Sequence, residues 1–246
     1  MKNISFYCPV PNAALTYATN FLSPKGYTFY NAPDPQVTHL LLPIPSFSPD
    51  GGIKGGGSLE TVLSLLPKEI TVIGGNLAHP ALSGYKTIDL LQDPVYLAKN
   101  AAITAHCAIQ ILASCLPCTL DGCPILVIGW GRIGKLLAHL LKANGASVTV
   151  SARKETDRAM LLAMGYSVQD LPDPSGFRAV CNTAPARVLP DCPDTLLKIE
   201  LSSVLGIGGK DVIWARGLPA IHAPESSGAL IAETLIRLLT QKEGFL

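Results

Sequence analysis

The sequence has few charged residues: only 15% of its 246 residues are Asp, Glu, Lys or Arg, and the formal net charge is +1. It has no long basic run, so neither a nucleic-acid surface nor an anionic membrane surface is indicated. Apolar residues make up 48%, which is enough for a sizeable core and excludes a disordered chain. Domains commonly have about 100–200 residues, so one large or two modest domains fit.

The N-terminus lacks the long apolar core of a secretory signal peptide. The stretch from Ala101 to Cys118 is apolar, but it contains Thr104 and His106 and is interrupted by Pro117. A membrane span needs about 20 predominantly apolar residues. We therefore predict a buried helix here, and a cytoplasmic protein that does not enter a membrane.

Cysteines are too irregular in number and spacing for a disulfide framework: the chain has 7 of them. Cys115 and Cys118 have the CxxC spacing, with Cys123 nearby. A redox pair or part of a metal site would be the functional interpretation, and small packing residues at a helix end the simpler one. Zinc needs a fourth ligand, which the sequence does not offer, so we predict no metal site.

Residues 1–96 show short apolar runs broken by Pro and Gly, which predict a small α/β domain. Strands are expected at 4–7, 39–43 and 69–74. A loop rich in Gly, Pro and Ser covers 46–57, and a short helix follows over 58–66. We take this segment as a substrate-binding lobe.

The remaining chain alternates between buried strands and amphipathic helices. An interdomain helix is assigned to 97–118, with the helix itself running from Pro94 to Cys115. Over 119–225, repeated βα units predict a doubly wound parallel sheet of the Rossmann type. A terminal helix over 226–240 is expected to return to the first lobe. The predicted elements of this part are strands at 124–129, 147–151, 178–183, 196–202 and 212–215, and helices at 132–144 and 157–164.

A glycine fingerprint, Gly129-Trp-Gly131-Arg-Ile-Gly134, stands between a predicted strand and a predicted helix, and another strand follows. This context is the one that dinucleotide binding requires. The first glycine permits the tight turn, the second lets the backbone approach a pyrophosphate, and the third lets helix and strand pack closely. The amides of Arg132 and Ile133 at the helix start would face the phosphates. The alternative is a glycine turn that binds nothing.

The end of the second strand of this domain selects between NAD and NADP. NAD sites usually place Asp or Glu there, which accepts hydrogen bonds from the adenosine ribose. This chain has Ser151, Arg153 and Lys154 instead. A serine and an arginine can bind a 2′-phosphate, so NADP is the predicted cofactor, with NAD as the second choice. The alternative is that Arg153 and Lys154 form a solvated surface.

Loops after the later strands should line the same crevice, because ligands of such sheets bind at the carboxyl ends of the strands. For each loop the alternative is an ordinary turn. The cofactor residues expected here are Thr183, Ala184, Pro185 and Ser202, and the substrate residues are Gly217, Leu218, Pro219 and the helix start at Ser226 and Ser227.

Further motifs are spread over most of the chain from about residue 40 onward. They are residues 41–45, 100–110, 120–134, 150–154, 181–185, 200–203, 217–219 and 223–224. Together they resemble the A subunits of dipicolinate synthase, a sporulation enzyme family of Gram-positive spore-formers. The 100–110 and 217–228 stretches are more specific than the glycine fingerprint.

The resemblance implies two α/β lobes with a cleft between them, as in D-2-hydroxyacid dehydrogenases, linked by crossing helices. It implies oxidation of a dihydrodipicolinate-type ring to pyridine-2,6-dicarboxylate. The first candidate for a general base is His106 and the second is His222, since imidazole titrates near neutral pH; both could instead be structural. Candidate donors to the small dicarboxylate are Arg216, Ser46, Thr104, Ser226 and Ser227.

The chain departs from the family motifs at two places. His106 and Cys107 stand where the family has Glu and Gly, and Ile221 replaces a lysine. Two other functions therefore stay open: another NADP-linked 2-hydroxyacid or keto-acid reductase, and a non-catalytic nucleotide-binding partner subunit. The family works with a B subunit, so such a partner is expected, and a homodimer is a further possibility.

Overall fold

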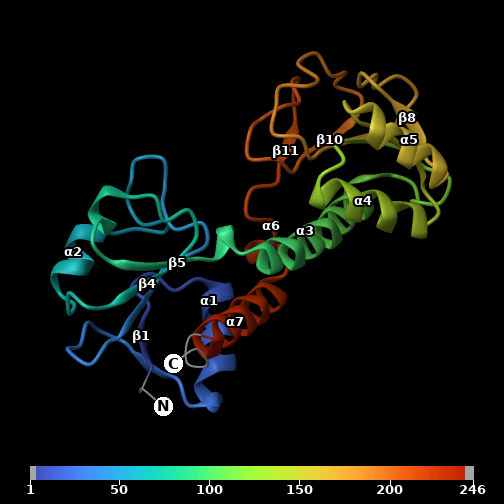
Figure 1. The fold of residues 1–246 in the computed structure, drawn as a ribbon. Coiled ribbons are helices and arrows are strands. Elements are labelled where there is room, and N and C mark those ends of the chain that lie inside the picture. The colour runs from blue at the N-terminus through green and yellow to red at the C-terminus, as the bar shows by residue number, and fades with distance from the viewer. Residues whose placement is uncertain (1–3, 242–246) are drawn as a thin grey trace. The chain divides into compact units, whose positions relative to one another are not determined.

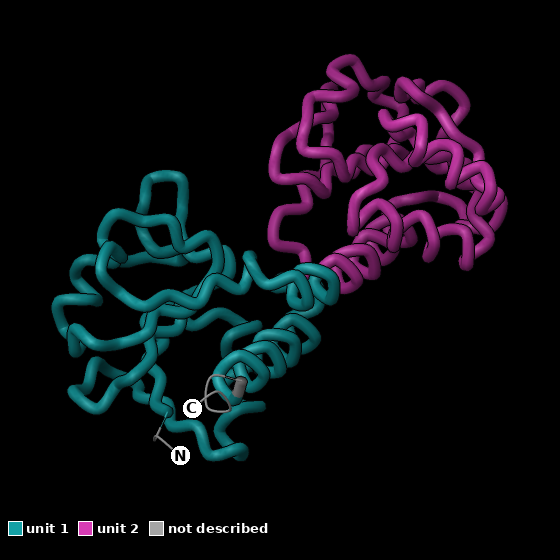
Figure 2. Tube along the Cα trace, viewed as in Figure 1, with its two compact units in different colours: residues 1–100, 220–246 teal, residues 101–219 magenta. Residues whose placement is uncertain are grey.

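The computed structural model describes residues 4–241, which form two compact units (Figure 2). One unit comprises residues 1–100 and 220–246, and the other residues 101–219. Met1–Asn3, considered above for a leader sequence, lie outside the described residues. The boundaries fall inside two helices, α3 (Pro94–Cys115) and α6 (Leu218–His222). We call the two parts unit 1 and unit 2.

Unit 1 is built on a five-stranded parallel sheet with the strand order β2-β1-β3-β4-β5. The strands are β1 (Ser5–Tyr7), β2 (Thr28–Tyr30), β3 (His39–Leu41), β4 (Thr71–Gly74) and β5 (Lys86–Asp89). Helix α2 (Leu59–Ser64) begins after Ser58, whose side chain accepts a hydrogen bond from the Thr61 amide, as expected of an N-cap. Short 3₁₀ turns lie at Ser23–Lys25, Pro80–Leu82 and Leu90–Gln92.

The first and last helices of unit 1 lie side by side (Figure 1). These are α1 (Ala13–Leu22) and α7 (Pro224–Gln241). They approach closely at Gly228, where an added Cβ would lie 2.5 Å from the Ala14 carbonyl oxygen. Two ion pairs join α7 to the start of α3: Arg237 with Asp93 at 2.6 Å, and Glu233 with Lys99 at 2.9 Å.

Unit 2 is built on a six-stranded parallel sheet with the order β11-β10-β9-β6-β7-β8. In terms of the unit's own strands this order is 6-5-4-1-2-3, which is the Rossmann order. Helices α4 (Arg132–Ala143) and α5 (Glu155–Ala163) pack beside β6, β7 and β8 (Figure 1). The strands are β6 (Pro124–Ile128), β7 (Ser147–Ser151), β8 (Ser167–Gln169), β9 (Ala179–Asn182), β10 (Leu197–Glu200) and β11 (Val212–Trp214).

The sheet topology confirms the predicted α/β class, and several element bounds need correction. The terminal helix begins at Pro224, two residues before the predicted start at 226. Leu218 and Pro219 were expected in a loop, but they begin α6 and are buried. Helix α5 covers 155–163 in place of 157–164. Five helices and strands were not predicted: α1, α6, β2, β5 and β8.

No helix within the described part of the chain is long and apolar enough to cross a membrane. Between residues 4 and 241 there is also no group of three or more His, Cys, Asp or Glu side chains that could hold a metal ion. Cys118 and Cys123 lie close together, with 3.9 Å between their sulfur atoms, and both are free thiols. Burial raises the pKa of the Cys123 thiol.

Candidate functional site

The candidate site of unit 2 lies at the carboxyl edge of its sheet, where the strand order reverses. Strand β6 pairs with β7 on one side and with β9 on the other. The loops that follow β6 and β9 therefore leave the sheet in different directions. In open α/β sheets such a reversal opens the crevice that binds ligands.

The three glycines after β6 have different surroundings. Gly129 has a φ of 100°, a conformation that side chains disfavour, and its amide donates to the Ser151 carbonyl at 2.9 Å. A Cβ on Gly134 would lie 2.2 Å from the Gly129 carbonyl oxygen, so only glycine lets α4 approach the turn this closely. A Cβ on Gly131 would meet no atom within 4 Å. The position therefore faces open space that a ligand can enter.

The start of α4 fits the pyrophosphate of a dinucleotide. Gly131 is its N-cap and offers no side chain to the first amides. The helix hydrogen bonds begin with the Lys135 amide, which donates to the Gly131 carbonyl at 3.0 Å. The amides of Arg132 and Ile133 thus precede the helix ladder and can bind an anion, which the helix dipole also favours. The Arg132 side chain is exposed and adds a positive charge.

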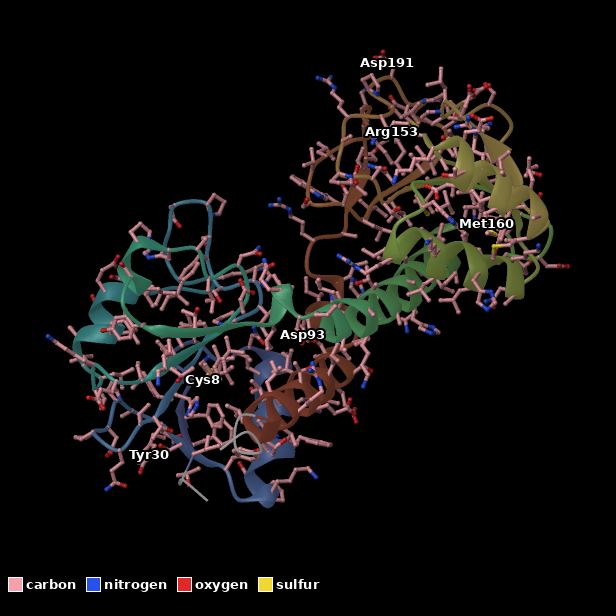
Figure 3. All side chains as sticks on the ribbon, viewed as in Figure 1. Cys8, Tyr30, Asp93, Arg153, Met160 and Asp191 are labelled. Atoms are coloured by element: carbon pink, nitrogen blue, oxygen red, sulfur yellow. The ribbon has the colours of Figure 1, made fainter. Side chains whose placement is uncertain are left out.

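Three cationic side chains gather after β7. Arg153 and Lys154 are exposed in the turn before α5 (Figure 3 labels Arg153). The guanidinium of Arg158 donates to the carbonyls of Ala152 at 2.9 Å and Arg153 at 2.7 Å. Ser151 is buried. Arg153 and Lys154 were predicted here and Arg158 was missed, since a cation within a helix gives no signal of the loop that it holds.

The loop after β9 braces the glycine turn. The amide and the hydroxyl of Thr183 both donate to the Ile128 carbonyl, at 2.8 and 2.9 Å. Its hydroxyl oxygen lies 2.7 Å from where a Gly129 Cβ would be. Pro185 is exposed and Ala184 is partly buried. Thr183 thus holds the loop after β9 against the glycine turn.

The loop after β10 is held by its own side chains. The Ser202 hydroxyl bonds to the Val204 carbonyl and accepts from the Val204 amide at 3.2 Å, so its contacts are internal to the turn. A fully buried carboxylate, Glu200, accepts hydrogen bonds from the amides of this loop and from the side chain of Asn182. Glu200 was not predicted as a site residue: it lies in the 200–203 motif, but the sequence gives no sign that its side chain binds the loop that follows.

Arg216 lies beside the loop after β10. Its guanidinium donates to the Ser203 carbonyl at 2.7 Å and lies 4.4 Å from the centre of the Trp214 ring. The Trp214 indole in turn donates to the Ser202 carbonyl at 3.3 Å. Arg216 is exposed, so a guanidinium whose orientation is partly fixed is available to a carboxylate.

The two candidate histidines belong to different units. His106 is exposed on the part of α3 within unit 2, and His222 is exposed at the end of α6 within unit 1. Thr104 is buried and has a partner.

Two of the three serine candidates of unit 1 form hydrogen bonds within the unit itself. The Ser46 hydroxyl is fully buried, donates to the Pro43 carbonyl at 2.8 Å and accepts from the Gly75 amide at 2.9 Å. The expected helix start at Ser227 is wrong: because α7 begins at Pro224, the Ser227 amide donates to the Ala223 carbonyl at 2.9 Å. Ser226 is exposed in the first turn of α7.

The chain was compared with family models, curated proteins and solved structures. No family model matches the chain. The chain is 26% identical over 242 residues to the A subunit of dipicolinate synthase from Bacillus subtilis (strain 168), covering 85% of this chain and 80% of that protein. This similarity confirms the resemblance that the sequence motifs indicated.

Solved structures show the same fold. The A subunit of dipicolinate synthase from Bacillus halodurans superimposes with a TM-score of 0.79 at 21% identity, over 96% of this chain and 98% of that chain. The apo structure of D-lactate dehydrogenase from Escherichia coli gives a TM-score of 0.61 at 16% identity, over 98% and 97%. The chain therefore has the same two-domain α/β fold as these proteins.

Proposed function

We propose that this chain is an oxidoreductase that binds a nicotinamide dinucleotide in unit 2 and oxidises a dihydrodipicolinate-type ring to dipicolinate. One observation supports nucleotide binding above all others: the glycine turn has an open face at Gly131 and a closed face at Gly134. The similarity to dipicolinate synthase A subunits supports the substrate class.

We further propose that NADP is preferred to NAD. Arg153, Lys154 and Arg158 place three cationic side chains near the end of β7. The carboxylate that would bind the ribose of NAD does not stand there; Glu155 comes later, in the first turn of α5. An arginine binds phosphate through two parallel donors, which makes Arg153 the main candidate for the 2′-phosphate.

The bound nicotinamide would supply the hydride acceptor. The chain's own residues would bind and orient the ring and accept its proton. Arg216, fixed against Trp214 and Ser203, is proposed to pair with one substrate carboxylate. His106 is proposed to take the proton, because a neutral imidazole can accept one near neutral pH.

The reaction is tested with freshly generated dihydrodipicolinate and NADP⁺, with dipicolinate absorbance and NADPH formation followed together. Coupled appearance of both products is expected. His106→Ala should lower turnover by about 10²-fold or more, as loss of a general base does, while His139→Ala, an exposed histidine on α4, is the matched control. If the protein binds NADPH but forms neither product, the proposed oxidation is wrong and the proposed nucleotide site is still supported.

Cofactor preference is tested by titrating NADPH and NADH into the protein and into Arg153→Ala. The wild type should bind NADPH more tightly, and the variant should lose about tenfold in NADPH affinity with little change for NADH, since a charge-assisted contact contributes about 1.5–3 kcal/mol. Equal affinity for both nucleotides in the wild type would contradict the preference.

A non-catalytic role is favoured by one feature. His106 and Ile221 replace residues of the related family's motifs, and Ile221 is 69% exposed. In this alternative the chain binds the nucleotide and supports a B-type subunit. Tight NADPH binding, no turnover, and co-purification with such a partner would favour it. Turnover of a small keto acid would instead indicate a different reductase.

A further inference from the structure

Glu200 is the centre of a hydrogen-bond network in unit 2. It stands at the last position of β10, and its side chain is fully buried. Its carboxylate accepts from three amides of the following loop: Ser202 at 3.0 Å, Gly206 at 2.7 Å and Ile207 at 3.1 Å. A buried carboxylate is tolerated only with such donors, because burial of a bare charge is very costly. The loop is therefore wrapped around this one side chain.

The network continues into the neighbouring strand. The Asn182 side-chain amide donates to both Glu200 oxygens, at 2.9 and 3.0 Å, and to the Ala184 carbonyl at 3.0 Å. The Ala184 amide returns a hydrogen bond to the Asn182 side-chain oxygen at 3.0 Å. Ala184 in turn lies beside the glycine turn, with its nitrogen 3.2 Å from where a Gly129 Cβ would be. One carboxylate thus links two crevice loops to the fingerprint.

The two loops are also packed directly on each other. The Gly206 carbonyl accepts from the amides of Val188 and Leu189, both at 3.0 Å. A Cβ on Gly206 would lie 2.2 Å from the Ala186 carbonyl oxygen and 2.5 Å from the Asn182 side-chain nitrogen. The loops after β9 and β10 are therefore joined by backbone hydrogen bonds and by close contact at Gly206.

These loops belong to the second half of the dinucleotide fold. The half built on β6 and β7 holds the pyrophosphate and the adenosine ribose, so the half built on β9, β10 and β11 faces the other nucleotide. We infer that Glu200 is a positioning residue that preforms the nicotinamide half of the crevice through Asn182 and the loop amides, without touching the cofactor. This inference rests on the proposed nucleotide binding.

Glu200→Gln tests the inference, because the carboxamide keeps the shape and replaces one acceptor oxygen by a donor. The new NH₂ group must face either the loop amides or the Asn182 amide, which are themselves donors. Asn182 cannot easily turn its oxygen toward the new group, because its side chain is hydrogen-bonded to Ala184. Two ligands are compared by calorimetry: NADPH and its fragment adenosine 2′,5′-bisphosphate, which lacks the nicotinamide half. We expect NADPH affinity to fall about tenfold and fragment affinity to stay within about twofold.

A second variant covers the case in which Glu200→Gln does not fold. Asn182→Ala leaves the three loop amides on Glu200 and removes the side-chain amide that joins Glu200 to Ala184, and the same selective loss is expected. Glu69→Gln, an exposed glutamate in unit 1, controls for loss of charge and should bind both ligands as the wild type does.

The outcomes separate the two proposals. A wild type that binds NADPH, with variants that lose both ligands equally or neither, overturns the positioning role and leaves the nucleotide site intact. A wild type that binds neither NADPH nor NADH overturns the proposed function and this inference together. A variant that still binds the fragment has a folded unit 2. If Glu200 only stabilised the fold, a variant that no longer binds NADPH would lose the fragment as well.

Discussion

Gly131 and Gly134 are three residues apart in one turn, yet their replacement by alanine should have opposite consequences. A Cβ at Gly131 enters open space, and one at Gly134 meets the Gly129 carbonyl oxygen at 2.2 Å. Gly131→Ala should keep the folding free energy within about 1 kcal/mol but weaken nucleotide binding by tenfold or more, because the methyl group occupies ligand space.

Gly134→Ala should instead destabilise unit 2 by about 1–3 kcal/mol or more, the cost of overpacking. Urea denaturation and NADPH titration of both variants provide the measurements. If Gly131→Ala binds NADPH as well as the wild type does, the assignment of the open face to a ligand is wrong.

Single residues of the site differ in how far the sequence could predict them. The glycines and Arg153 are predictable because each has a local reason: a turn, a helix start or a strand end. Glu200 and Asn182 are 18 positions apart, and their pairing depends on β9 lying beside β10. Arg158 acts on carbonyls at the end of β7 from within α5. Such roles arise only after the chain has folded.

At the level of elements, the ion pair between Arg237 of α7 and Asp93 before α3 should make the stability of unit 1 depend on pH. Burial alone would raise the pKa of Asp93, but the hydrogen bond and charge of Arg237, with the amides of Tyr96 and Val95, lower it below its usual range. A carboxyl with a lowered folded pKa stabilises the protein above the unfolded pKa of about 3.9 and loses this contribution as the pH falls through the folded value.

Arg237→Gln should therefore destabilise unit 1 by about 1–2 kcal/mol at pH 7, a partly buried pair being stronger than a surface one. The difference from the wild type should shrink below about pH 3 to 4. Urea denaturation across this range is the measurement. Lys99→Gln breaks an exposed pair and should change stability by less than about 1 kcal/mol; an equal effect of both variants would argue against the role of burial.

The crossing of α1 and α7 depends on Gly228. An added methyl group would lie 2.5 Å from both the Ala14 carbonyl oxygen and the Tyr17 Cβ. Alanine gains about 1 kcal/mol of helix propensity over glycine, and overpacking costs about 1–3 kcal/mol, so Gly228→Ala should lower stability overall. Thermal unfolding tests this, with Ser226→Ala, an exposed position on the same helix, as control. A stabilised Gly228→Ala variant would show that the helices can separate at little cost.

Elements were predictable where a long pattern marks them. Strand β6 is an unbroken apolar run and α4 has a clear helical period, so both were found within one or two residues. Strands β2, β5 and β8 lie at the edges of their sheets and are mostly exposed or half-buried, so no apolar run marks them in the sequence. Helix α1 was missed although Asn12 caps it, since it packs on α7, which lies more than 200 positions later.

For the whole molecule, the division of unit 1 into two chain segments predicts the effect of a truncation. Helix α7 contributes Ile231, Leu235 and Leu239 to the buried interior of unit 1. A chain ending at Ala223 should therefore lose hydrogen-exchange protection in α1, while the amides of β6 and β9 in unit 2 keep theirs. Exchange measured by mass spectrometry on both chains is the test. Equal loss in both units would mean that they fold as one cooperative body.

Because unit 2 lies between the two chain segments of unit 1, it is completed first during synthesis. Domains fold as units while the chain emerges at about 5–20 residues per second. All of unit 2 has been synthesised by Pro219, whereas unit 1 still awaits α7. At the end of α6 the chain therefore contains every residue of unit 2 but not of unit 1, so unit 2 needs no later part of the chain in order to fold.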